Sequence, residues 1–243
     1  MTRSLVGRKD QGPRPSAPIL VLTGLAREAA CLHGEGVVPL CSGADVRVLR
    51  TALESLESSE FSAVVSFGLA GGLDYGLAPG DAVIGTQAIG GSEIFETHPA
   101  LRRVLAEGFA GAGVPVREGA VRGVDAAILT VPAKTVLRAS GGAIAVDMES
   151  HLAGAFARRR GLPFAIVRVV SDPASRALPP LATKAVKPDG SVDVSGVLRE
   201  LLREPGQIGD LIRAGLDARA AFATLGRCGG LVGPLLRLVL SGL

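Results

Sequence analysis

The chain has 243 residues, which suits one large α/β domain with a sizeable core. Apolar residues make up 47% of it, aromatic residues only 3%, and the formal net charge is +3. Nucleic acid is not an expected partner, because surfaces that bind it combine basic patches with aromatic rings on which bases stack. The three cysteines form no CxxC pair, and their odd number argues against a disulfide framework, so we expect a reduced, cytoplasmic setting.

Apolar runs alternate with helical patterns along the chain, which indicates a βα architecture. Strands are predicted, in chain order, at 18–22, 63–67, 81–84, 143–146 and 164–170. Helices are predicted at 45–56, 99–112, 149–160, 197–203 and 207–225. The last predicted strand is almost wholly apolar, as expected of a strand that is buried on both faces. The stretch 173–195 has no periodicity, and a connection of that length is usually functional or disordered.

The two ends of the chain differ in composition from the region between them. Residues 1–17 lack the apolar core of a signal peptide and are expected to form a disordered leader. The domain is expected over 18–226, and an apolar tail over 227–243. The tail is shorter than a membrane-spanning helix and contains Arg237. It is either a terminal helix packed on the domain or on a partner subunit, or a surface element that contacts a membrane or a lipid-like substrate.

Four short segments lie at or just after the ends of predicted strands and contain groups that could carry chemistry. They are 24–28 (GLARE), 68–73 (GLAGGL), 147–150 (DMES) and 168–172 (RVVSD). In the first, Glu28 could polarise a water or a ribose hydroxyl, and Arg27 could bind a phosphate. The second matches neither GxGxxG nor a P-loop, but its glycines would let backbone N–H groups approach an anion or a sugar. Each segment also has a plain structural interpretation, as a turn, a helix cap or a solvated ion pair.

Two acidic residues dominate the last two segments. Glu149 could accept hydrogen bonds from two vicinal hydroxyls, and the dipole of the helix that it begins would keep it ionised. Met148 beside it would offer an apolar surface to a sugar ring. Asp172 follows the most apolar predicted strand, and ligands of open α/β sheets bind at such carboxyl ends. The three histidines are isolated in the sequence, and no metal-ligand spacing is present.

The order and spacing of these motifs resemble the purine nucleoside phosphorylase and methylthioadenosine/S-adenosylhomocysteine nucleosidase superfamily. The matching segments are 68–73, 79–84 (PGDAVI), 146–150, 161–164 (GLPF) and 168–172. The resemblance implies a single-domain three-layer α/β/α fold with a mixed central sheet, usually in a homo-oligomer. It also implies an enzyme that cleaves the N-glycosidic bond of a purine nucleoside without a metal or cofactor, with inorganic phosphate as a candidate co-substrate.

The resemblance assigns roles to individual residues. Asp172 would protonate purine N7 as the general acid, and Glu28 would activate water. Glu149 would bind the ribose hydroxyls, with Met148 packed on the sugar. Further residues assigned to substrate binding are Ile128, Ala127, Gly71, Ser171 and Arg168, and those assigned to phosphate are Arg27, Gly24 and Leu69. Because Leu69 stands where the nucleosidases commonly have a small hydroxyl residue, the choice between water and phosphate as the attacking group stays open.

The C-terminal third is similar to that of the hopanoid-associated phosphorylases, through 187–193 (KPDGSVD), 207–225 and the apolar tail. This similarity implies adenosylhopane as the substrate, with release of adenine and a ribosyl or phosphoribosyl hopane. Leu178, Leu181 and the tail leucines would line an apolar entrance, and the tail would give a cytoplasmic enzyme peripheral membrane contact. Two alternatives are a methylthioadenosine/S-adenosylhomocysteine nucleosidase and a non-catalytic nucleoside- or lipid-binding module. A Rossmann-type dehydrogenase is excluded because the first strand is not followed by GxGxxG.

Overall fold

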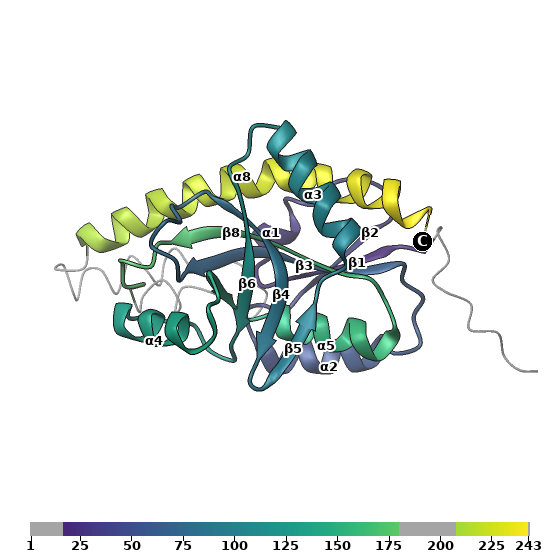
Figure 1. Cartoon of the computed structure of the whole chain (residues 1–243), viewed down its shortest axis with the longest axis horizontal. Helices are drawn as coiled ribbons and strands as arrows, with labels where there is room; N and C mark the ends of the chain where they lie inside the picture. Colours follow the sequence, from purple (N-terminus) through teal and green to yellow (C-terminus); the bar gives the residue numbers. More distant parts are fainter. Residues whose placement is uncertain (1–16, 180–207, 243) are drawn as a thin grey trace, which may run out of the picture.

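The structure, a computed structural model, describes residues 17–179 and 208–242. Within these residues the strands form one mixed, eight-stranded sheet with helices on both sides (Figure 1). The strands are β1 (Ile19–Thr23), β2 (Val37–Cys41), β3 (Ala63–Gly72), β4 (Ala82–Gly90), β5 (Glu93–Glu96), β6 (Val116–Gly123), β7 (Ala145–Asp147) and β8 (Phe164–Asp172). The helices are α1 (Ala26–Ala29), α2 (Val46–Ser55), α3 (Pro99–Gly111), α4 (Val131–Gly141), α5 (Ser150–Arg160) and α8 (Ile208–Leu240).

The sheet follows the order β2-β1-β3-β7-β6-β4-β5, and β8 pairs with both β3 and β4. Because β8 joins β3 to β4, the strands β3, β7, β6, β4 and β8 close into a ring. Strands β1, β3 and β8 are parallel to one another, whereas β8 is antiparallel to β4 and β3 is antiparallel to β7. The parallel strands therefore end at the same edge of the sheet, and the predicted segments after β1 and at the end of β8 are brought together there.

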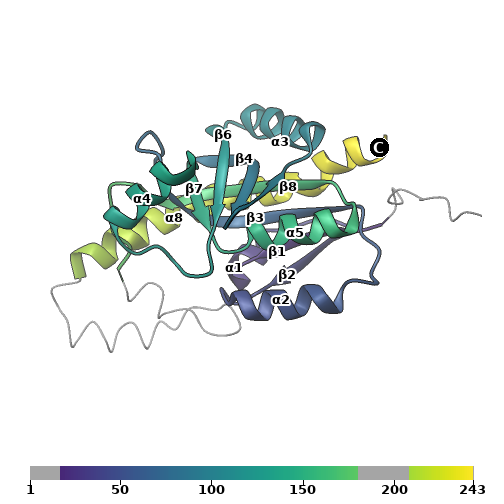
Figure 2. The same cartoon turned by 60° about the horizontal axis from the view of Figure 1, so that its bottom comes forward.

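Each face of the sheet has its own helices. Leu20 and Leu22 of β1 pack in a core cluster that includes side chains of α2 and α5. Ile19 and Val21, which point the other way, pack in a second cluster with side chains of α3 and α8. Figure 2 shows α2 and α5 on one side of the sheet and α3 and α8 on the other. These three layers confirm the predicted α/β/α architecture with a mixed central sheet.

Local sequence signals set the helix boundaries. Asp45 caps α2 by accepting a hydrogen bond from the backbone N–H of Arg47 at 2.8 Å. Gly161 ends α5 in the left-handed conformation, with φ of 61°, which a residue without a side chain adopts freely. The helices predicted at 45–56, 99–112 and 149–160 match α2, α3 and α5 to within a residue at each end.

Five elements have no counterpart among those predicted from the sequence: β2, β5, β6, α1 and α4. Strand β6 has no apolar run to mark it, because arginine, glutamate and glycine interrupt its sequence. Strand β2 is apolar, but Pro39 stands in its middle, and a proline there argues against a strand. The strand predicted at 63–67 ends too early, because β3 continues to Gly72, pairing with β8 as far as Gly71 and with β7 at Gly71 and Gly72. Several predictions fall outside the described residues: all but the last residue of the leader predicted at 1–17, the helix predicted at 197–203, Leu181, and most of the stretch 173–195.

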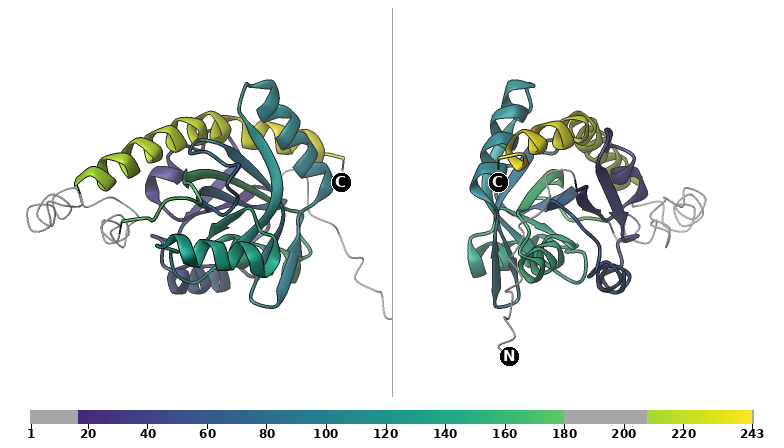
Figure 3. Two further views of the ribbon diagram at one scale, coloured as in Figure 1. Left: turned by 60° about the vertical axis from the view of Figure 1, so that its left-hand side comes forward. Right: turned by 90° about the vertical axis from the view of Figure 1, so that its right-hand side faces the viewer.

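Helix α8 runs unbroken from Ile208 to Leu240, so the expected boundary at 226–227 lies inside a helix and does not mark a change of element. From residue 221 onward it packs on the sheet through a row of buried side chains: Ala221, Leu225, Cys228, Val232, Leu236 and Leu240. Its first half projects past the sheet (Figure 3). The helix is long and apolar enough to cross a membrane, but 44% of its most apolar window is buried inside the protein. The packed-helix interpretation of the tail accounts for this burial.

Candidate active site

The predicted segments meet at the carboxyl edge of β1, β3 and β8. Three carboxylates, those of Glu28, Asp147 and Glu149, surround the guanidinium of Arg168 there, and all four side chains are buried. We refer to these four residues as the carboxylate cluster. Asp172 stands at the end of β8, four residues after Arg168, and is also buried.

Arg168 organises the cluster. Its Nε lies 2.6 Å from Oδ2 of Asp147, and its Nη2 lies 3.1 Å from Oε2 of Glu149. The same guanidinium donates to the hydroxyl of Ser66 and, at 3.3 Å, to the backbone carbonyl of Leu69. Burial by itself would lower the pKa of Arg168, but the surrounding carboxylates more than offset this and raise it. Arg168 therefore stays charged, with its hydrogen-bonding capacity directed at the protein.

Glu28 is held by backbone N–H groups from two segments of the chain. Its Oε2 accepts from Gly24 at 2.8 Å and from Leu25 at 2.9 Å, and its Oε1 accepts from Leu69 at 2.8 Å. Burial raises the pKa of Glu28, against the lowering effects of Arg168 and of these N–H groups. A buried carboxylate with a raised pKa is a better base than a solvated one, which suits the predicted removal of a proton from water.

Glu149 is the N-cap residue of α5, and Asp147 two positions earlier anchors the same turn by accepting from the backbone N–H of Ser150 at 3.1 Å. Burial raises the pKa of Glu149 to about 7, opposed by Arg168 and reinforced by the negative charges of Asp147 and Glu28. The expectation that the helix dipole keeps Glu149 ionised is therefore too simple, because burial outweighs the dipole. Glu149 changes its charge near neutral pH.

Three glycines allow the backbone to approach these groups. A Cβ atom on Gly24 would lie 2.7 Å from Oε1 of Glu149, and a Cβ atom on Gly68 would lie 2.7 Å from Cδ of Glu28. On Gly71 it would lie 3.1 Å from Oδ2 of Asp172. The sequence predicts that these glycines bring the backbone close to a ligand. In the structure they bring the backbone close to the acidic side chains.

Asp172 has a cationic partner that the sequence did not reveal. The Nζ atom of Lys134, from α4, lies 2.5 Å from Oδ2 of Asp172, and the hydroxyl of Ser171 donates to Oδ1 at 2.7 Å. Burial raises the pKa of Asp172, while Lys134 and Ser171 oppose this rise. A signal for α4 was available, because Thr130 caps it and Pro132 stands in its first turn, but nothing adjacent to Lys134 indicates an ion pair.

The residues predicted to contact base and sugar lie around this edge. Met148 is partly buried against the core cluster that includes α2 and α5. Ile128 is partly buried against a small cluster with Leu73 and Val146, and a Cβ atom on Gly71 would lie 3.2 Å from Val146. Ile128 is thereby placed beside the strand ends that hold Asp172. Ala127 is exposed.

The groups assigned to phosphate are engaged elsewhere. Arg27 is exposed, and its guanidinium lies 4.1 Å from the ring centre of Phe222 on α8, in a cation–π contact. The backbone N–H groups of Gly24 and Leu69 both donate to Glu28. The structure therefore does not bring Arg27 into the carboxylate cluster.

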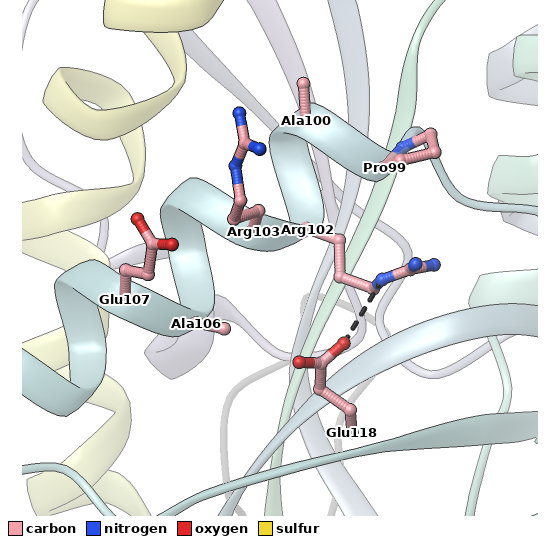
Figure 4. Close-up of a pocket in the computed structure, with 7 residues that line it drawn as sticks. All are labelled: Pro99, Ala100, Arg102, Arg103, Ala106, Glu107 and Glu118. Atoms are coloured by element: carbon pink, nitrogen blue, oxygen red, sulfur yellow. Dashed lines mark ion pairs between the residues drawn. The ribbon is translucent and has the colours of Figure 1, made fainter.

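A separate groove lies along α3, where Arg102 forms an ion pair with Glu118 of β6 at 3.1 Å (Figure 4). It has a volume of about 520 Å³ and is lined also by Pro99, Ala100, Arg103, Ala106 and Glu107. Because it contains none of the predicted site residues, we do not assign it to the active site.

The mixed central sheet with helices on both faces (Figure 2) is the fold expected of a nucleoside phosphorylase-like protein. The sequence matches the Phosphorylase superfamily over residues 19–203, and the chain belongs to this superfamily. Membership confirms the predicted enzyme class, which cleaves N-glycosidic bonds. No curated protein matches the chain.

Solved structures with the same fold include two enzymes of Helicobacter pylori. Its 5'-methylthioadenosine/S-adenosyl homocysteine nucleosidase has a TM-score of 0.61 and 16% identity, over 80% of this chain and 100% of that one. Its futalosine hydrolase has a TM-score of 0.60 and 16% identity, over 78% of this chain and 98% of that one. A putative methylthioadenosine nucleosidase of Weissella paramesenteroides has a TM-score of 0.58 and 18% identity, over 87% and 98%. At these identities the likeness concerns the fold alone.

Proposed function

We propose that this protein cleaves the N-glycosidic bond of an adenine nucleoside, that the nucleoside is adenosylhopane, and that adenine is released. The observation that carries the proposal is the assembly of Glu28, Glu149 and Asp172 at one sheet edge, although they come from three distant segments of the chain. The Helicobacter pylori nucleosidase, which shares this fold, has been solved as a variant with 5'-methylthioadenosine in its active site.

Asp172 is the proposed general acid. Cleavage leaves positive charge on the sugar and negative charge on the base, so a proton given to purine N7 as the bond breaks lowers the barrier. Burial raises the pKa of Asp172, which favours the protonated form that this role needs. Glu149 is the proposed ligand of the ribose hydroxyls, and its carboxylate would also stabilise the cationic sugar.

Water is the attacking group that the arrangement favours. Glu28 would take a proton from water while the oxygen bonds to C1′, and the electrons of the broken C1′–N9 bond would pass to the purine. Phosphate would bring further negative charge beside three carboxylates, and the guanidinium of Arg168 already contacts two of them. If water attacks, the second product is a ribosyl hopane, whereas attack by phosphate would give a phosphoribosyl hopane.

The hopane assignment rests on the similarity of the C-terminal third and on apolar surface. Ile212 and Leu216, on the projecting half of α8, are exposed large apolar side chains. A rigid hydrocarbon substituent would need apolar contacts of this kind, and the same surface would support peripheral contact with a membrane. A methylthioadenosine/S-adenosylhomocysteine nucleosidase is the second candidate, favoured by the folds of the solved structures.

The test is release of adenine, followed by chromatography, from adenosylhopane, methylthioadenosine and adenosylhomocysteine, each with and without phosphate. Release from adenosylhopane alone supports the full proposal, and release from the small nucleosides supports the second candidate. Strict dependence on phosphate would contradict attack by water. Binding of nucleosides without release under any condition would point to a non-catalytic binding module.

Asp172→Asn should remove nearly all cleavage while the circular dichroism spectrum stays unchanged, since the amide has no acidic proton to give. The matched control is Asp210→Asn, because Asp210 is exposed on α8 and should leave the rate unchanged. Full activity of Asp172→Asn would overturn the assignment of the general acid.

A further inference from the structure

Lys134 is a fully buried lysine in the first turn of α4. Only 1% of its side chain is exposed. Its Nζ atom lies 2.5 Å from Oδ2 of Asp172, 2.8 Å from the carbonyl oxygen of Pro173 and 3.0 Å from that of Arg176. An ammonium group has three N–H donors, so these three acceptors use all of them. Lys134 therefore touches both the proposed general acid and the turn that follows it.

Burial of a lysine ammonium group requires a compensating interaction. Taking a charge out of water is strongly unfavourable, and an apolar side chain of similar volume would often be as stabilising as the ion pair. The two carbonyl groups could be served by any neutral donor. Only the carboxylate of Asp172 gains specifically from a positive charge, which points to a role at Asp172 and not in packing alone.

We propose that Lys134 is a positioning residue for the general acid, whose fixed ammonium stabilises the carboxylate that Asp172 becomes when its proton passes to the leaving adenine. This inference rests on the proposed function. In the step, the proton moves from Asp172 to N7, and the electron pair of the C1′–N9 bond moves to the purine. The proton is regained from solvent after adenine leaves, and Lys134 keeps its own proton throughout.

The charge balance explains why a cation assists an acid here. In the form that reacts, Asp172 is protonated and Lys134 faces a neutral carboxylic acid. The step restores the ion pair present in the structure, so the attraction between the two groups grows as the proton leaves. Among the residues that the structure describes, the other groups that face Asp172 are the hydroxyl of Ser171 and the carboxylate of Asp217 on α8. Asp217 is itself paired with Arg176, and its negative charge helps Asp172 to retain its proton before substrate reacts.

Lys134→Gln isolates the charge, because glutamine retains N–H donors for the carbonyl groups but is neutral. On the acidic plateau, where Asp172 is protonated, we expect kcat for adenine release to fall at least roughly tenfold. The alkaline limb of the pH profile should move upward by roughly one to three pH units, since an opposite charge at this distance lowers a carboxyl pKa by that amount. Lys134→Arg should leave the limb in place.

The matched control is Arg138→Met, which removes a cation from the same helix. Arg138 pairs with Asp74 at 2.5 Å and should move neither the limb nor the plateau. A lower rate in Lys134→Gln with an unmoved limb would show a merely structural role and overturn the proposal. An unchanged rate in Lys134→Gln would also overturn the proposal.

A measurement without substrate separates this inference from the proposed function. The carboxyl resonance of Asp172, labelled with carbon-13 and assigned with Asp172→Asn, should titrate at higher pH in Lys134→Gln than in the wild type. If Lys134→Gln does not fold, the same titration in Lys134→Arg should match the wild type, and a displaced curve there would count against the pairing. Wild-type protein that titrates as expected but cleaves no nucleoside would refute the proposed function while leaving the pairing intact.

Discussion

Replacing Glu149 by glutamine should make the protein more stable at pH 8 and less active. Burial raises the pKa of Glu149 from 4.5 to about 7, so the folded protein favours the neutral form of this side chain. At about 1.4 kcal/mol per pKa unit, the difference corresponds to about 3 kcal/mol. Glutamine has nearly the shape of the neutral acid, so Glu149→Gln avoids most of that unfavourable term.

The sign of the pH dependence follows from linkage. A carboxyl whose folded-state pKa is raised contributes stability below its unfolded pKa, near 4.5, and loses that contribution as pH rises to about 7. The wild type should therefore lose stability between these values relative to Glu149→Gln. The two proteins should have similar melting temperatures at pH 4.5, whereas at pH 8 the variant should melt roughly 6–12 °C higher, at about 2–4 °C per kcal/mol.

Thermal unfolding from pH 4.5 to 8, followed by circular dichroism, tests this prediction. The control is Glu57→Gln, because Glu57 forms an exposed ion pair with Arg159 at 2.8 Å and its removal should change stability little at any pH. A difference between Glu149→Gln and the wild type that does not vary with pH would refute the reasoning, as would a variant less stable than the wild type at pH 8. The same variant should bind nucleoside more weakly, since it lacks the second anionic oxygen.

Two glycine substitutions follow from close backbone approach. Gly24→Ala would place a Cβ atom 2.7 Å from the carboxylate of Glu149, so nucleoside affinity, measured by calorimetry, should fall at least roughly tenfold. Gly111→Ala is the control, because the space around Gly111 is open and affinity should not change. Gly229→Ala would place a Cβ atom 2.1 Å from a carbonyl oxygen just after α1, so α8 should be displaced and stability should fall by about 1–3 kcal/mol in urea unfolding. Gly226→Ala meets nothing within 4 Å and should instead stabilise the helix by about 0.5–1 kcal/mol; equal effects of the last two changes would contradict the packing of α8.

The strongest sequence patterns predicted both the fold and the acidic residues. Strand β8 is apolar over most of its length and α5 ends in a glycine and a proline, so the amino-acid sequence alone locates Asp172 and Glu149 at the ends of elements. Arg168 carried a signal too, since a charge inside a strand buried on both faces must be paired. The identity of its partners could not be predicted, because they come from other segments of the chain.

Lys134 could not be predicted. Its partner Asp172 lies 38 positions away, and the contact exists only because α4 packs beside the end of β8. A lysine in a short helix is usually solvated, so composition gives the opposite expectation. Strand β3 shows a similar limit: Gly68, Gly71 and Gly72 favour a loop, and pairing with β8 and β7 keeps them extended.

The two parts of the site differ in charge, and the difference fits the proposed chemistry. The carboxylate cluster sets three acidic side chains against one guanidinium, whereas Asp172 has Lys134 as a cation of its own. Positive charge develops on the sugar as the glycosidic bond breaks, and the excess of carboxylates in the cluster would stabilise that charge. The departing base needs a proton, and in our proposal Lys134 favours the transfer of that proton from Asp172. A phosphate dianion would have to bind beside the carboxylate cluster, where the guanidinium of Arg168 already pairs with Asp147 and Glu149. Under the proposed function, we therefore expect hydrolysis and not phosphorolysis.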